Sequence, residues 1–209
     1  MVPRLRLTLL GVGAMASPRF APAGLLVAWG VHRVAFDGGP GAEPPTGRLD
    51  AWLVTDERAE LRSALRRLAA ERGLVPRMTD ADVGGLRIRA LPVAHTSHPT
   101  CGYRIEAATE VVVWAPEFRS FPAWAQGADL MFAEASCWDR PIRFRGGAGG
   151  HAPVREVGAE AAGHRIERLV YAHIGRPCLR AMDAGRTPEY GEWGREGHTY
   201  LLPPHGRAR

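Results

Sequence analysis

The 209-residue chain has a formal net charge of +5 and is 45% apolar, which is enough to form one sizeable core. Its basic side chains are all arginines, and they lie among acidic residues rather than in one block, which argues against a nucleic-acid-binding face. No apolar run approaches the roughly 20 residues that cross a bilayer, and the three distant cysteines contain no C-x-x-C pair, so we expect a cytoplasmic protein without a membrane span or disulfide framework.

The first third of the chain predicts strands followed by a helix. "LRLTLLGVGA" is typical of a strand that ends in a glycine turn, and "GLLVAWGVHRVAFDGG" predicts a hairpin through Gly30. "AWLV" is a short buried strand. After it, Thr55 or Asp56 could cap a helix that runs to about Arg72. One face of this helix would carry Leu61, Leu65 and Leu68.

The rest of the chain alternates between strands and helices. The expected strands are "GLRIRALPV", "CGYRIEA", "EVVVWAP", "ADLMFAEAS", "RLVYAHIG" and "HTYLL". Between the fourth and fifth of these, an Ala- and Glu-rich helix is expected over residues 153–163. Two mixed sheets packed face to face with helices outside, an α/β sandwich in four αββα layers, would account for this order. We expect one such domain over residues 1–209.

Seven segments carry a resemblance to a known family. In chain order they are "LTLLGVGAMASPRF", "GLLVAWGVHRVAFDGGPG", "LPVAHTSHPTCGYRIE", "VVVWAPEF", "ADLMFAEAS", "GGHAPVREVGAEAAG" and "RLVYAHIGRP". Together they resemble the metallo-β-lactamase superfamily. Within it they are similar to the branch that contains ribonuclease Z, a phosphonate-pathway cyclic phosphodiesterase and pyrroloquinoline quinone biosynthesis protein B. The resemblance implies the four-layer fold and a site for two zinc or manganese ions.

The first metal-binding motif of this family is degenerate here. Its pattern His-x-His-x-Asp-His should fall on "LVTDERAEL", where its four ligands become Asp56, Arg58, Glu60 and Leu61. Arginine stays protonated in proteins and leucine has no donor atom, so a dinuclear centre of the usual kind is not expected. Asp56 and Glu60 could still offer oxygen, although a helix-capping role for Asp56 is the simpler reading.

The resemblance implies a histidine ligand in "PVAHTSHPTCGYRIE", for which His95 and His98 are rivals. The interval to Gly102 is about one residue too long for His95 and shorter than usual for His98. His95 is preferred because it follows the strand end directly. The other histidine would then only hydrogen-bond within its loop.

Three later positions complete the implied site. The bridging aspartate of the family falls on Pro116, which cannot bind metal, so the adjacent Glu117 could reach inward or instead lie exposed at a helix start. In "YAHIG", His173 matches a metal ligand at the end of a buried strand. In "GGHAP", His151 matches the histidine that donates a proton to the leaving oxygen or stabilises it.

Two functions follow from this pattern. The first is a hydrolase with at most one divalent metal, Zn or Mn, held by His95 or His98, by His173 and by Glu117 or Glu60. His151 would be the general acid and a phosphodiester the substrate. The second is a metal-free, non-catalytic member that binds a small molecule or a protein partner. Trp138 and Arg140 would either line the substrate pocket or pack beneath a loop.

Overall fold

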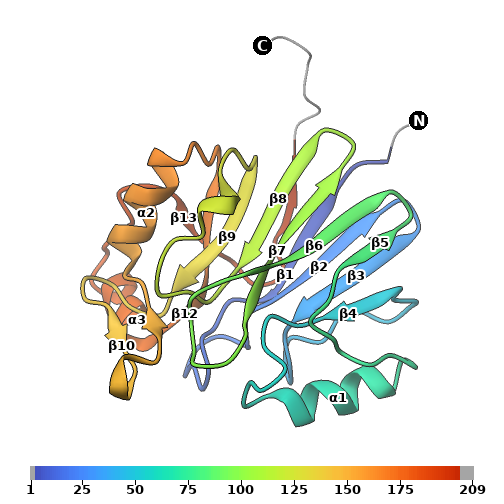
Figure 1. Cartoon of the computed structure of the whole chain (residues 1–209), viewed down its shortest axis with the longest axis horizontal. Coiled ribbons are helices and arrows are strands. Elements are labelled where there is room, and N and C mark those ends of the chain that lie inside the picture. Colours follow the sequence, from blue (N-terminus) through green and yellow to red (C-terminus); the bar gives the residue numbers. More distant parts are fainter. Residues whose placement is uncertain (1–2, 203–209) are drawn as a thin grey trace.

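The computed structural model describes residues 3–202, which form two β-sheets that face each other (Figure 1). The five-stranded sheet has the order β14-β1-β2-β3-β4, with β3 and β4 parallel and the other neighbours antiparallel. Its strands are β1 (Arg6–Gly11), β2 (Gly24–Trp29), β3 (His32–Asp37), β4 (Ala51–Leu53) and β14 (Thr199–Leu201).

The second sheet has seven strands in the order β13-β12-β9-β8-β7-β6-β5 and is also mixed. Strands β13, β12, β9 and β8 run parallel, whereas β5 to β8 form antiparallel pairs. These strands are β5 (Ala81–Val83), β6 (Leu86–Pro92), β7 (Cys101–Ala107), β8 (Glu110–Ala115), β9 (Leu130–Ala135), β12 (Leu169–Ile174) and β13 (Glu192–Trp193). A separate small hairpin pairs β10 (Ile142–Arg143) with β11 (Gly150–His151).

Helices cover the outside of the two sheets, as the sequence predicts. Helix α1 (Arg62–Ala70) lies beside β4, whereas α2 (Val154–Gly163) and α3 (Arg176–Asp183) lie together on the other side of the molecule (Figure 1). Two single 3-10 turns span Ala123–Ala125 and Arg145–Gly147. The expected four-layer α/β sandwich of two mixed sheets is therefore confirmed. Among residues 3–202, no helix combines the length and the apolar character that a bilayer crossing requires.

The main core lies between the sheets, and a smaller one lies under α1. Side chains from both sheets, including Phe36, Tyr103 and Phe132, are fully buried in the main core. In the smaller core, Leu65 and Ala69 of α1 pack with Trp52. Burial of a large apolar side chain contributes about 1.5–3 kcal/mol, so this leucine face fixes α1 against the five-stranded sheet.

The expected start of α1 is wrong by several residues. Thr55 and Asp56 do not cap the helix, which begins after Leu61 without a side-chain cap. The Thr55 backbone N–H and hydroxyl both donate to the Asp37 carboxylate, at 2.7 and 3.0 Å. Asp56 instead accepts from the Arg58 backbone N–H at 2.7 Å, which closes a local turn. Because both capping side chains are used elsewhere, residues 56–61 form turns at the sheet edge.

Candidate active site

Five segments bring polar side chains to one edge of the two-sheet sandwich. His95 follows β6, Glu117 follows β8, Glu134 lies in β9, His151 ends β11 and His173 lies near the end of β12. The imidazole ring of His151 lies between those of His95 and His173, with ring centroids 4.8 and 5.6 Å away. Residues up to 78 positions apart in sequence thus share one site.

Glu117 joins two of these histidines. Its Oε2 lies 2.7 Å from Nε2 of His95, and its Oε1 lies 2.7 Å from Nε2 of His173. Burial alone would raise the pKa of Glu117, but the charges of His173 and His95 hold it well below its usual value. Burial likewise opposes protonation of His173, yet Glu117 and Glu134 raise its pKa to about 10. Glu117 is therefore a carboxylate held between two rings whose protonated forms its charge stabilises.

The Nδ1 atom of each of these two rings, His95 and His173, has its own hydrogen-bond partner. Nδ1 of His95 donates to the carbonyl oxygen of Gly150 at 3.1 Å. Nδ1 of His173 lies 2.8 Å from Oγ of Ser136 and 3.6 Å from Oε1 of Glu134. A proton fixed at Nδ1 leaves Nε2 as the nitrogen that can bind a metal. Both rings therefore point Nε2 at the Glu117 carboxylate.

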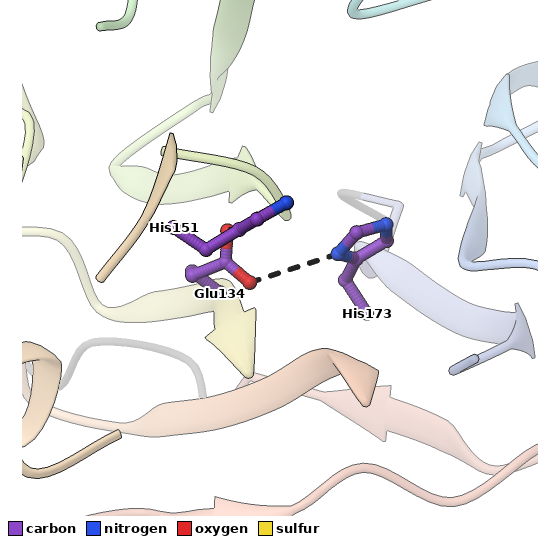
Figure 2. Close-up of side chains that lie close together, drawn as sticks. All are labelled: Glu134, His151 and His173. Carbon is purple, nitrogen blue, oxygen red and sulfur yellow. Dashed lines mark hydrogen bonds and ion pairs between the residues drawn. The ribbon is translucent and has the colours of Figure 1, made fainter. Parts of the chain in front are cut away.

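Glu134 is a site residue that the sequence analysis did not single out. It is fully buried, and its Oε2 lies 2.6 Å from Nδ1 of His151. The dashed line in Figure 2 marks its other ion pair, with His173. Glu134 also accepts from the backbone N–H groups of Ser136 at 2.7 Å and Phe118 at 3.1 Å. Burial raises its pKa, but His151 and His173 lower it to about 2. The glutamate in the otherwise apolar "LMFAEA" was the available sign, because a fully buried carboxylate needs a partner.

Backbone strain accompanies the site. His173 has φ of 60°, in the left-handed region that favours glycine, and the pairing of β12 with β9 shifts register between Tyr171 and Ile174. Such conformations cost on the order of 1–3 kcal/mol and concentrate at functional positions. The strand therefore departs from regular geometry where its histidine enters the site.

His98 lies apart from this group. Its Nε2 lies 2.9 and 3.0 Å from the two carboxylate oxygens of Asp56, and its side chain is 22% exposed. Of the two rivals, the structure places His95, and not His98, against Glu117. Arg58 is exposed and takes part in none of the ion pairs found within residues 3–202.

The donor atoms of the side chains determine which groups of residues could bind a metal ion. Residues 56–61 do not fit the family's first site, since Asp56 is paired with His98 and Leu61 offers no donor. His95, His173 and Glu117 offer two Nε2 atoms and one carboxylate, which are donor types that zinc binds. A second group, Glu134, His151 and His173, has donor atoms within 4.8 Å of one another (Figure 2). We favour the first set, because Glu134 is already saturated by His151 and two backbone donors.

A small cavity of about 60 Å³ opens onto this edge. Its lining includes Asp56, Glu60, Glu117 and His173 together with Met15 of the loop after β1. Trp138 and Arg140, for which the sequence predicts either a pocket wall or packing beneath a loop, do not line it. They line a separate and larger cavity.

Comparisons with known proteins agree with this architecture. The family model described as "Beta-lactamase superfamily domain" matches residues 47–174. None of the curated protein sequences matches significantly. The metallo-β-lactamase fold protein YhfI from Bacillus subtilis is 15% identical, with a TM-score of 0.75 over 96% of this chain and 100% of that chain.

Two further solved structures share the fold. A diphosphatase from the PhnP family is 17% identical, with a TM-score of 0.72 over 97% of this chain and 98% of that chain. Zn²⁺-bound PqqB from Methylobacterium extorquens is 15% identical, with a TM-score of 0.67 over 94% of this chain and 100% of that chain. The family match spans more than half of the chain, and the predicted sandwich is present, so the protein belongs to the metallo-β-lactamase superfamily.

Proposed function

We propose that this protein is a hydrolase of small phosphodiesters with a reduced metal site. At most one divalent ion, Zn or Mn, would be held by His95, Glu117 and His173, and His151 would act as general acid. The observation that carries the proposal is that Nε2 of His95 and Nε2 of His173 both contact Glu117. The Nδ1 atom of each ring has a separate hydrogen-bond partner. A divalent ion in such a set supplies a Lewis acid and activates water.

Glu117 and Glu134 would then have different roles in this site. Glu117 balances the charge of the two imidazoles and fixes their separation. Glu134 orients His151 through Nδ1, which leaves the Nε2 proton of His151 available for the leaving oxygen. The fold shared with a PhnP-family diphosphatase supports a phosphate ester as substrate, and the fold shared with Zn²⁺-bound PqqB supports a zinc ion.

Metal analysis and a phosphodiesterase assay test this function together. Protein purified without chelator should contain about one Zn or Mn per chain and should hydrolyse bis(p-nitrophenyl) phosphate. His173→Ala should lose both, because it removes a ligand of the proposed set. Glu134→Gln should keep the metal but lose about 10–100-fold in activity, as expected for a partner that orients a site residue. A His173→Ala variant with full metal content and activity would overturn the proposal.

A second function rests on the same contacts. Because each oxygen of the Glu117 carboxylate already contacts one Nε2 atom, both rings have hydrogen-bond partners without an ion. With residues 56–61 also unable to form the usual first site, a non-catalytic protein that binds a small molecule is the alternative. Purified protein without metal, and without activity after addition of Zn²⁺ or Mn²⁺, would favour this alternative.

A further inference from the structure

A cavity of about 400 Å³ lies between α3 and the β10–β11 hairpin, which are neighbours in Figure 1. Residues 137–140, which follow β9, form one wall. Pro177 and Arg180 of α3 form another, and Ile142 of β10 contributes from the hairpin. Its volume falls in the range of small-molecule sites, about 300–1,000 Å³.

The charges on this cavity are unbalanced. Its lining contains three arginines, Arg140, Arg180 and Arg186, against one carboxylate, Asp139. Asp139 and Arg186 lie 4.0 Å apart and both are more than half exposed, so their ion pair is weak. Arg140 and Arg180 belong to none of the ion pairs within residues 3–202. Two guanidinium groups without an ion pair within residues 3–202, and a third in a weak one, are thus available for an anion.

The floor of the cavity is apolar. Trp138 contributes a ring that is braced by Trp193, with ring centroids 5.7 Å apart and planes inclined by 36°. On the α3 side, Ala181 and Ala184 have short side chains that leave the space open. An indole ring at the base of an arginine-lined cavity can pack against a flat apolar group while the guanidinium forks bind phosphate oxygens.

The cavity and the candidate active site are adjacent but separate. Ile142 pairs with His151 in the hairpin, and Cys137 directly follows Ser136, the partner of His173. Nevertheless, the two cavities share no lining residue. Binding here therefore requires neither a metal nor any residue of the proposed catalytic group.

We propose that this cavity is a second binding site, specific for a small organic phosphate that carries a flat ring. The phosphoryl group would lie among Arg140, Arg180 and Arg186, and the ring would lie against Trp138. The arginine fork fits phosphate bidentately, which a single ammonium group does not.

Calorimetric titration of the full chain with phenyl phosphate and, in parallel, with inorganic phosphate tests this site. Phenyl phosphate should bind with one-to-one stoichiometry and more tightly than inorganic phosphate. Arg180→Gln/Arg186→Gln should weaken binding of both by at least about tenfold, which corresponds to about 1.4 kcal/mol. Arg155→Gln, an exposed helix arginine outside the cavity, is the matched control and should bind as wild type does.

Three further variants test where the phenyl ring binds and whether binding occurs in this cavity. Trp138→Ala should remove the preference for phenyl phosphate, and Ala184→Trp should block both probes by filling the space. His173→Ala should bind both probes normally. Absence of saturable binding, wild-type affinity in the double arginine variant, or loss of binding in His173→Ala would each overturn the second site. Equal affinity for the two probes would overturn its ring specificity.

Discussion

Nε2 of His173 and Oε1 of Glu117 lie 2.7 Å apart, and the family resemblance predicts a metal ligand at His173 and a bridging carboxylate just before Glu117. The register of the sequence assigns that carboxylate position to Pro116. The longer side chain of Glu117 reaches the site from the next position and contacts both histidines. Glu117 therefore supplies a carboxylate at this sheet edge, which Pro116 cannot do.

Glu117→Gln should lower both the stability of the metal-free protein and its affinity for a metal ion. A neutral amide cannot compensate both imidazoles, so the free energy of unfolding should fall by about 1–3 kcal/mol. Metal uptake should also fall, because an anionic ligand is lost. Urea unfolding and elemental analysis measure the two effects. Glu60→Gln, an exposed carboxylate at the rim of the same cavity, should change neither. Equal losses in both variants would argue against Glu117 as the specific ligand.

Alanine substitutions separate the two rival histidines. His95→Ala should lower metal content to background, because it removes the ring that faces Glu117. His98→Ala should retain the metal and lose at most about 1 kcal/mol of stability, since its partly exposed pair with Asp56 is replaced by water. Elemental analysis and urea unfolding of the two purified variants provide the measurement. Metal loss in His98→Ala alone would reverse the assignment.

The stability of metal-free protein should fall as pH rises above 6.5. His173 has an ordinary pKa of 6.5 and a pKa of about 10 in the fold, so its contribution is complete below pH 6.5 and declines towards pH 10. One such group changes the free energy of unfolding by at most about 1.4 kcal/mol per pH unit. Urea titrations in chelator between pH 6.5 and 9 should show this slope.

The control is His173→Ala, in which the free energy of unfolding should depend less steeply on pH than in the wild-type protein. The comparison stops at pH 9 because burial also raises the pKa of Cys137 and Cys178, whose titration adds a similar loss at higher pH. Identical slopes in the two proteins would show that His173 is not protonated in the folded state.

Gly149→Ala should disturb the site through the backbone of His95. A Cβ at Gly149 would lie 1.8 Å from the carbonyl oxygen of His95, an impossible approach that forces the two loops apart. We expect a loss of about 1–3 kcal/mol in the free energy of unfolding, together with reduced metal content. Gly163→Ala, where a Cβ meets nothing within 4 Å, is the matched control. It should be neutral or stabilising by up to about 1 kcal/mol. A Gly149→Ala protein as stable as this control would contradict the contact.

The sequence by itself determined the sandwich and the absence of metal-donor atoms at Arg58 and Leu61. Alternating and continuous apolar runs specify strands, and no packing can give Leu61 a donor atom or remove the charge of Arg58. It also identified His151 and His173 as strand-end candidates, because the motifs around them are local.

Only the tertiary structure decided which side chains meet. His95 and His98 differ by three positions in one loop, and their separation depends on Gly150 and Asp56, which come from distant segments. In the sequence, Glu134 is only one residue of a buried strand. The structure shows that β9 brings it against His151. The helix start was misjudged for the same reason, since Asp37 binds the expected capping residue Thr55 from another strand. Local periodicity carries no information about such long-range hydrogen bonds, which form only when the two sheets pack.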